Sequence, residues 1–317
     1  MATLKELVLR ESPITGGHRA CAGCGFPQII RIVLMAAKDP VVVIAATGCL
    51  EVTTTIYPYS AWNVPFLHNA FENAAATASG VEAAYEALLR KGKLKGKINV
   101  VAFGGDGGTY DIGFQSLSGA MERGHNLLYV CYNNEGYMNT GVQRSGATPR
   151  GASTTTEPAG KVRQGKVRPR KDLTAIMAAH DLPYVAQASV GYYMDLLKKA
   201  EKAFSIEGPK FLNVLQPCRL GWPYKPELTF ELGRLAVQTA IWPLYEVENG
   251  KWKLTMKPRE KKPITEFMKH QDRFRHLFRP GNEELLADLQ TEVDRNWQTL
   301  LEKCLPAGQA GGEGGSK

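Results

Sequence analysis

Short apolar runs alternate with amphipathic stretches along most of this 317-residue chain. Continuous runs of β-branched and other apolar residues predict buried strands, and these runs fall at 41–46, 98–103, 127–132, 184–188 and 211–215. Apolar residues at helical spacing predict helices near 27–37, 69–90, 111–123, 172–180, 193–205, 230–242 and 283–303. Because strands and helices alternate, we expect an α/β fold whose sheet is mainly parallel and carries helices on both faces.

Several segments depart from this alternation. Residues 1–17 contain breakers and predict an irregular lead-in. The aromatic and proline-rich stretch 57–65 predicts a packed surface loop or a lid. Residues 133–170 predict a long loop of a kind that is usually functional or disordered, and 246–252 predicts a small hairpin. We therefore predict a main domain over 1–230, an extension over 231–305 that makes subunit contacts, and a disordered Gly-rich tail over 306–317.

The composition is that of an ordinary globular protein, with 44% hydrophobic and 22% charged residues. No apolar run is long enough to span a membrane, and the N-terminus lacks the apolar core of a signal peptide, so we expect a cytoplasmic protein without a membrane partner. The net charge of +8 admits nucleic-acid binding. However, the basic residues are dispersed along the chain and no known nucleic-acid-binding motif is present, so we expect no nucleic-acid partner. The densest basic stretch, 161–171, could meet an anionic ligand, an acidic partner or only solvent.

Polar residues follow four of the predicted strands directly. Cys49 follows the first strand, Asp106 the second, Asn134 the third and Cys218 the fifth. In parallel sheets, ligands bind outside the carboxyl ends of the strands. The sequence therefore predicts one functional edge that carries both a cysteine site and a metal–phosphate site.

The metal–phosphate prediction depends on Gly105-Asp106-Gly107 together with Asn133-Asn134. Alone, Gly-Asp-Gly is a common turn, and it matches neither a Walker A loop nor a dinucleotide fingerprint. Asp106 is a hard oxygen ligand, Asn134 offers an amide oxygen, and glycines let the backbone approach a ligand closely. Such a set suits Mg²⁺ that also binds phosphate oxygens.

The six cysteines are too few for a disulfide scaffold. Cys21-Ala22-Gly23-Cys24 instead suggests metal or redox chemistry. No strand precedes this motif, as one usually does in a thioredoxin-like redox dithiol. No second Cys-x-x-Cys follows it, as one more often does in a structural zinc site. With Cys49 and Cys218 it provides four thiolates, which fit a [4Fe–4S] cluster or a zinc ion equally well.

Together these motifs resemble the β subunit of multi-subunit 2-oxoacid:ferredoxin oxidoreductases, most closely the pyruvate type. The resemblance covers about residues 15–280. Besides the motifs above, it is carried by the segments Gly17-His18-Arg19-Ala20-Cys21, Ala46-Thr47-Gly48-Cys49-Leu50-Glu51-Val52, Ala70-Phe71-Glu72-Asn73-Ala74-Ala75-Ala76, Tyr132-Asn133-Asn134-Glu135-Gly136-Tyr137-Met138-Asn139-Thr140-Gly141 and Trp242-Pro243-Leu244-Tyr245-Glu246.

The resemblance implies a thiamine diphosphate-binding fold with thiamine diphosphate, Mg²⁺ and a [4Fe–4S] cluster as cofactors. It implies that the cofactor contacts are Gly48, Cys49, Gly105, Asp106, Gly107, Asn134 and Gly136, that Asp106, Asn134 and the carbonyl of Gly136 bind Mg²⁺, and that Cys21, Cys24, Cys49 and Cys218 bind the cluster. Asn139 corresponds to an active-site asparagine near the substrate. The glutamate that activates thiamine comes from a partner subunit in this family, so Glu51 and Glu72 are left without a role.

The resemblance also implies partners. We expect an α subunit that supplies the other half of the thiamine site, further γ and δ subunits with ferredoxin-like clusters, ferredoxin as electron acceptor, coenzyme A as acyl acceptor and a 2-oxoacid as substrate. One alternative keeps the cofactors but uses oxalate or another 2-oxoacid. Another, from a different class, is a zinc-stabilised interaction domain without catalysis.

Overall fold

The computed structural model describes residues 4–305, so the predicted tail 306–317 lies outside the described residues. One eight-stranded sheet organises the fold, in the order β2-β1-β3-β4-β6-β5-β7-β8. The strands are β1 Val41–Ala46, β2 Phe66–Asn69, β3 Asn99–Gly105, β4 Leu127–Asn133, β5 Tyr184–Ser189, β6 Lys210–Leu215, β7 Leu244–Glu248 and β8 Lys251–Met256. The six strands from β2 to β5 are parallel, and β7 pairs antiparallel with both β5 and β8.

Helices cover both faces of the sheet. They are α1 Leu4–Val8, α2 Phe26–Met35, α3 Cys49–Thr54, α4 Ala74–Arg90, α5 Phe114–Glu122, α6 Leu173–Ala178, α7 Tyr193–Ser205, α8 Thr229–Gln238, α9 Thr265–Met268 and α10 Glu283–Lys303, with short turns η1 Gly107–Ile112, η2 Val190–Tyr192, η3 Pro226–Leu228 and η4 Asp272–Phe278. Alternate residues of each central strand enter two apolar clusters, one against α2 and α7, the other against α4, α5 and α6. A strand buried on both faces explains the unbroken apolar runs.

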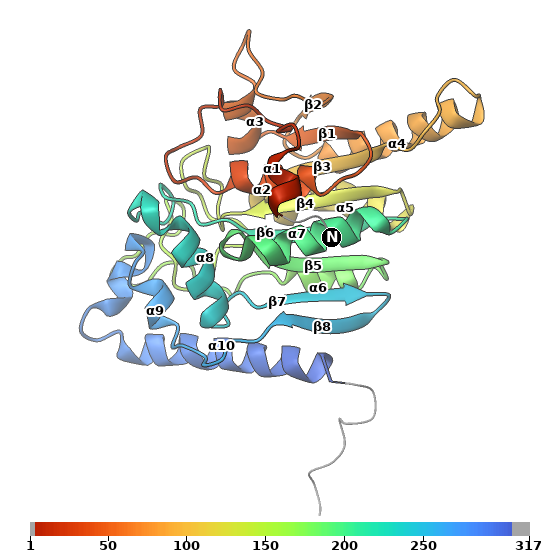
Figure 1. Cartoon of the computed structure of the whole chain (residues 1–317). Helices are drawn as coiled ribbons and strands as arrows, with labels where there is room; N and C mark the ends of the chain where they lie inside the picture. The colour runs from red at the N-terminus through yellow and green to blue at the C-terminus, as the bar shows by residue number, and fades with distance from the viewer. Residues whose placement is uncertain (1–3, 306–317) are drawn as a thin grey trace, which may run out of the picture.

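The C-terminal part adds a third apolar cluster around Trp222, Trp242 and Phe267, which joins α8, α9, η4 and α10. Figure 1 shows these elements grouped beside β7 and β8, with α10 running along that end of the molecule. The hairpin of β7 and β8 continues the same sheet, and its turn uses Asn249 and Gly250, both at positive φ. The division at residue 230 stays a prediction.

The predicted fold class is confirmed, with corrections in detail. The 57–65 loop leads into an edge strand of four residues, β2, and Cys49 opens a short helix, α3; the sequence pattern indicated neither. The predicted helix 69–90 begins at Ala74, and the lead-in contains α1. No helix within residues 4–305 combines the length and hydrophobicity needed to cross a membrane.

Candidate active site

Four adjacent strands deliver the predicted site residues to one edge. β1, β3, β4 and β6 are consecutive neighbours in the sheet. Gly105 pairs with Tyr132, and Asn133 pairs with Leu215, so the residues that follow these strands emerge at the same level. Since all four strands are parallel, Cys49, Asp106, Asn134 and the 216–218 segment lie along one edge, as predicted.

Asp106 is completely buried at this edge. Its Oδ2 accepts a hydrogen bond from Ser145 Oγ at 2.5 Å, and its Oδ1 accepts one from the amide of Asn134 at 3.1 Å. Burial raises the pKa of the carboxyl group to about 7, although these two hydrogen bonds favour the ionised form. A buried carboxylate without a cation is unfavourable, so the site is chemically suited to a positive charge.

The side chain of Asn134 faces two further oxygens. Its amide group lies 2.8 Å from Asp106 Oδ1 and 2.9 Å from the carbonyl oxygen of Gly136. If the amide nitrogen points inward, it donates hydrogen bonds to both oxygens. If the amide oxygen points inward, it forms a set of three oxygens with Asp106 Oδ1 and the carbonyl oxygen of Gly136. Two cis ligands of an octahedral Mg²⁺ with bonds near 2.05 Å lie about 2.9 Å apart. The spacing of these oxygens therefore fits Mg²⁺.

All seven predicted cofactor residues line one small cavity, and Asn139 lies at its exposed side. The cavity has a volume of about 100 Å³, and its lining also includes the side chains of Phe71, Tyr137 and Met138. A Cβ at Gly107 would lie 2.5 Å from the ring of Tyr137, and one at Gly48 would lie 2.8 Å from the Tyr132 hydroxyl. Glycine is therefore needed at both positions to keep the backbone close to the cavity.

The four predicted cluster cysteines are neighbours. Burial, together with the charges of the other cysteines, raises the pKa of the Cys24 and Cys49 thiols to about 12. Burial also raises the pKa of Cys218, which interacts with Cys21 in the same way. Thiols with raised pKa values are poor nucleophiles, whereas binding to iron or zinc would favour their thiolates. This environment suits metal ligation better than a redox dithiol.

Two hydrogen bonds point at the cysteine sulfurs. Gln216 Nε2 donates to Cys24 Sγ at 3.2 Å, and the amide of Gly221 donates to Cys218 Sγ at 3.4 Å. Within residues 4–305, no three His, Cys, Asp or Glu side chains converge on a single metal-ion position. Sulfurs around one zinc would lie roughly 3.8 Å apart, while a cubane cluster binds each sulfur to a different iron and needs a wider set.

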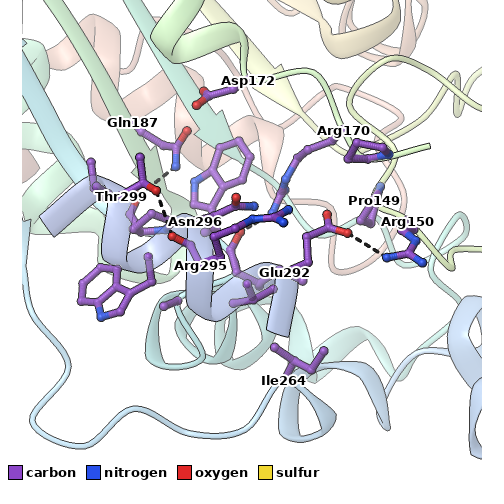
Figure 2. A pocket seen from close by; sticks show the side chains of 18 of the residues that line it. Pro149, Arg150, Arg170, Asp172, Gln187, Ile264, Glu292, Arg295, Asn296 and Thr299 are labelled. Atoms are coloured by element: carbon purple, nitrogen blue, oxygen red, sulfur yellow. Dashed lines mark hydrogen bonds and ion pairs between the residues drawn. The ribbon is translucent and has the colours of Figure 1, made fainter. Parts of the chain in front are cut away.

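The structure adds residues that sequence reasoning missed. Ser145 orients Asp106 from the long loop, and Tyr137 donates to Asp111 Oδ2 at 3.2 Å while it covers Gly107. Tyr137 belongs to the quoted motif and could have been found there, whereas Ser145 lies in a loop without periodicity. Figure 2 shows a separate cavity of about 390 Å³ between α10 and the 149–172 segment, and no predicted site residue lines it.

Fold and site together define a thiamine diphosphate-binding domain. A family model described as thiamine pyrophosphate enzyme, C-terminal TPP binding domain, matches residues 46–214, just over half of the chain. The chain is 56% identical to pyruvate synthase subunit PorB of Methanocaldococcus jannaschii, over 92% of this chain and 97% of the relative. It therefore belongs to the PorB-like subunits of the thiamine pyrophosphate enzyme family.

Two further relatives and one solved structure are also similar to this chain. Pyruvate synthase subunit PorB of Pyrococcus furiosus is 44% identical, with 95% of this chain and 99% of the relative covered. Ketoisovalerate oxidoreductase subunit VorB of Pyrococcus abyssi is 45% identical, with 92% and 93% covered. A solved structure of 2-oxoglutarate:ferredoxin oxidoreductase from Magnetococcus marinus shares the fold, at a TM-score of 0.55 and 20% identity, over 71% of this chain and 81% of that one.

Proposed function

We propose that this chain is the β subunit of a thiamine diphosphate-dependent pyruvate:ferredoxin oxidoreductase. The observation that carries the proposal is the position of Cys49, which lines the same cavity as Asp106 and also neighbours the other three cysteines. A metal–diphosphate site and a thiolate site thus adjoin. The names of the relatives support pyruvate as substrate.

Asp106, Asn134 and the carbonyl of Gly136 would hold Mg²⁺, and the metal would bind the diphosphate. When bound, thiamine diphosphate supplies the carbanion on which a 2-oxoacid is decarboxylated, and a [4Fe–4S] cluster supplies a one-electron acceptor. The hydroxyl group of Ser145 and the backbone amide of Asn134 orient the carboxylate of Asp106 before the metal binds. This preorganisation lowers the cost of binding.

Other residues of the chain shape the cavity. Phe71, Tyr137 and Met138 line it with apolar surface. Asn139, at its exposed side, would hold a polar group of the substrate. Cys21, Cys24, Cys49 and Cys218 would hold the cluster, and the hydrogen bonds from Gln216 and Gly221 would stabilise negative charge on two of the sulfurs.

The proposal includes partners and a location. An α subunit would complete the thiamine site, γ and δ subunits would carry further clusters, and ferredoxin and coenzyme A would take the electrons and the acyl group. The enzyme would work in the cytoplasm. A second candidate keeps this machinery but acts on a branched 2-oxoacid. It is favoured by VorB of Pyrococcus abyssi, whose identity of 45% is close to the 44% of PorB of Pyrococcus furiosus.

The test is anaerobic purification of the complex, followed by iron and acid-labile sulfide analysis and by turnover against pyruvate, other 2-oxoacids and oxalate with coenzyme A and ferredoxin. We expect a cluster in this chain and the highest kcat/KM with pyruvate. A higher kcat/KM with a branched 2-oxoacid or with oxalate would establish that alternative instead. A colourless protein with one zinc and no turnover would establish the interaction domain.

A further inference from the structure

Glu135 lies between the two residues proposed to bind Mg²⁺, yet it does not line the cavity. Its φ is 63°, in the left-handed region that non-glycine residues rarely adopt. Its side chain is only 3% exposed. A residue in this conformation persists only where its surroundings fix it, so the contacts of Glu135 decide the shape of the metal-binding loop.

Two arginines hold the carboxylate of Glu135, one on each oxygen. Arg170 Nη1 lies 2.8 Å from Oε1, and Arg273 Nη2 lies 2.6 Å from Oε2. Arg170 also donates to the carbonyl of Ile241 and lies over the ring of Trp242. Figure 2 shows Arg170 reaching from the 149–172 segment toward α10. The carboxylate is therefore directed away from the cavity, into the C-terminal part of the protein.

Arg273 reaches the metal loop by a second route. It belongs to η4, is almost completely buried, and donates through Nε to Gln271 at 2.8 Å. Its guanidinium lies 3.8 Å from the centre of the Trp222 ring. Trp222 Nε1 in turn donates to the carbonyl of Asn134 at 2.7 Å. One arginine, 138 residues away in sequence, thus supports both Asn134 and Glu135.

The remaining polar groups of this loop are also held. The amide of Glu135 donates to Asn133 Oδ1 at 2.9 Å, and the carbonyl of Glu135 accepts from Thr148 Oγ1 at 2.8 Å. The loop is thus fixed on its protein side, while the side chain of Asn134 and the carbonyl of Gly136 face Asp106. Groups that orient metal ligands in this way typically contribute 10–100-fold to metal affinity.

We propose, on the basis of the magnesium–diphosphate function above, that Glu135 and Arg273 are positioning residues for Mg²⁺. The pair presents Asn134 and Gly136 to the metal, so the C-terminal extension determines the affinity of a site that it does not touch. This role is distinct from subunit contact, which we predicted for the extension.

The test is the Mg²⁺ dependence of thiamine diphosphate binding to the assembled complex, measured by calorimetry. Glu135→Gln keeps the shape of the side chain but leaves the buried Arg273 and the partly buried Arg170 without their carboxylate. We expect it to raise the Mg²⁺ concentration at half-saturation about tenfold or more, with full binding restored by excess Mg²⁺ and with the cluster absorbance retained. Arg273→Lys keeps the charge but loses the planar fork, so we expect a smaller increase in the same direction.

Glu246→Gln is the matched control. Glu246 is also a buried acid between two cations, Lys202 at 3.0 Å and Lys253 at 3.7 Å, but it lies on β7, separated from β4 by two strands. We expect it to lower the thermal stability without changing the Mg²⁺ requirement. Equal shifts in both variants, or none in Glu135→Gln, would overturn the positioning role.

If Glu135→Gln does not fold, a third variant provides the test. Glu135→Asp keeps the charge and shortens the side chain by one methylene, so it should fold and still weaken Mg²⁺ binding. An unchanged Mg²⁺ requirement in that variant would then overturn the role. If the wild-type complex binds no thiamine diphosphate at any Mg²⁺ concentration, the proposed function itself fails, and the positioning role fails with it.

Discussion

At the scale of single residues, the site combines features that are unfavourable until a ligand arrives. The carboxyl group of Asp106 is completely buried, and this burial raises its pKa to about 7. The amide of Asn134 must turn its oxygen inward to bind a metal, which places three oxygens together. A divalent cation relieves both features, and the buried carboxylate destabilises the metal-free protein. Function and stability therefore oppose each other at these positions.

Asp106→Asn tests this opposition. The folded-state pKa of Asp106 is raised above its ordinary value of 3.8, so the folded protein binds more protons than the unfolded chain between these values. Its contribution is present at low pH and is lost as pH rises toward 7. Without Mg²⁺, the wild-type protein should lose thermal stability as the pH rises from about 4 to about 7.

The variant should lack this part of the pH dependence, exceed the wild-type Tm at pH 8 in chelator, and fail to gain stability from Mg²⁺ with thiamine diphosphate. Differential scanning calorimetry at several pH values measures all three. A variant that still gains stability from Mg²⁺ would show that Asp106 is not a metal ligand.

Gly107→Ala tests the close packing of the cavity. Its Cβ would lie 2.5 Å from the Tyr137 ring, so the ring must move, and we expect a loss of about 1–3 kcal/mol in stability together with weaker thiamine diphosphate binding. Gly80→Ala in α4 is the control, because its Cβ meets nothing within 4 Å, and it should stabilise the helix by about 0.5–1 kcal/mol. Urea unfolding and cofactor titration separate the two effects. Unchanged binding in Gly107→Ala would show that Tyr137 can move freely.

At the scale of elements, the sequence predicted most of what builds the site. Continuous apolar runs indicated β1, β3, β4 and β6, and the rule for parallel sheets placed their carboxyl ends together. It did not indicate β2, because Phe66–Asn69 is a four-residue edge strand with a mostly half-buried or exposed pattern. The partners of Glu135 could not be predicted either. Arg273 lies in a short turn with no periodicity, and only the folded third cluster brings it to the loop.

The proposed Mg²⁺ site and the proposed cluster site use residues that follow different strands. We therefore expect a variant in one site to leave the other site intact. Asp106 follows β3, whereas Cys218 follows β6 and is not among the residues that line the cavity with the proposed Mg²⁺ ligands. Asp106→Ala should therefore abolish Mg²⁺-dependent thiamine diphosphate binding and leave the cluster absorbance intact. Cys218→Ala should remove or destabilise the cluster and spare cofactor binding. Visible absorbance and cofactor titration of anaerobic samples measure both, and loss of the cluster alone in Asp106→Ala would contradict the assignment.

At the scale of the whole molecule, the chain presents only part of a cofactor site. The cavity lined by Gly105, Asp106 and Gly107 holds about 100 Å³. Sites for ligands of cofactor size usually enclose about 300–1,000 Å³. This volume suits the metal and diphosphate end, and the rest of the cofactor needs walls from elsewhere. Tyr57 and Tyr59, 94% and 78% exposed, belong to the loop that precedes β2, and we expect this exposed aromatic surface to contact a partner.

The last prediction follows from this incompleteness. The chain purified alone, with saturating Mg²⁺, should bind thiamine diphosphate weakly and show no turnover of pyruvate. Addition of the partner subunits should tighten cofactor binding, because the second wall buries the thiamine rings, and should produce pyruvate-dependent ferredoxin reduction. Double replacement of Tyr57 and Tyr59 by serine should weaken assembly in sedimentation velocity without changing the cluster content of the isolated chain. Full turnover by this polypeptide alone would show that it closes its own site.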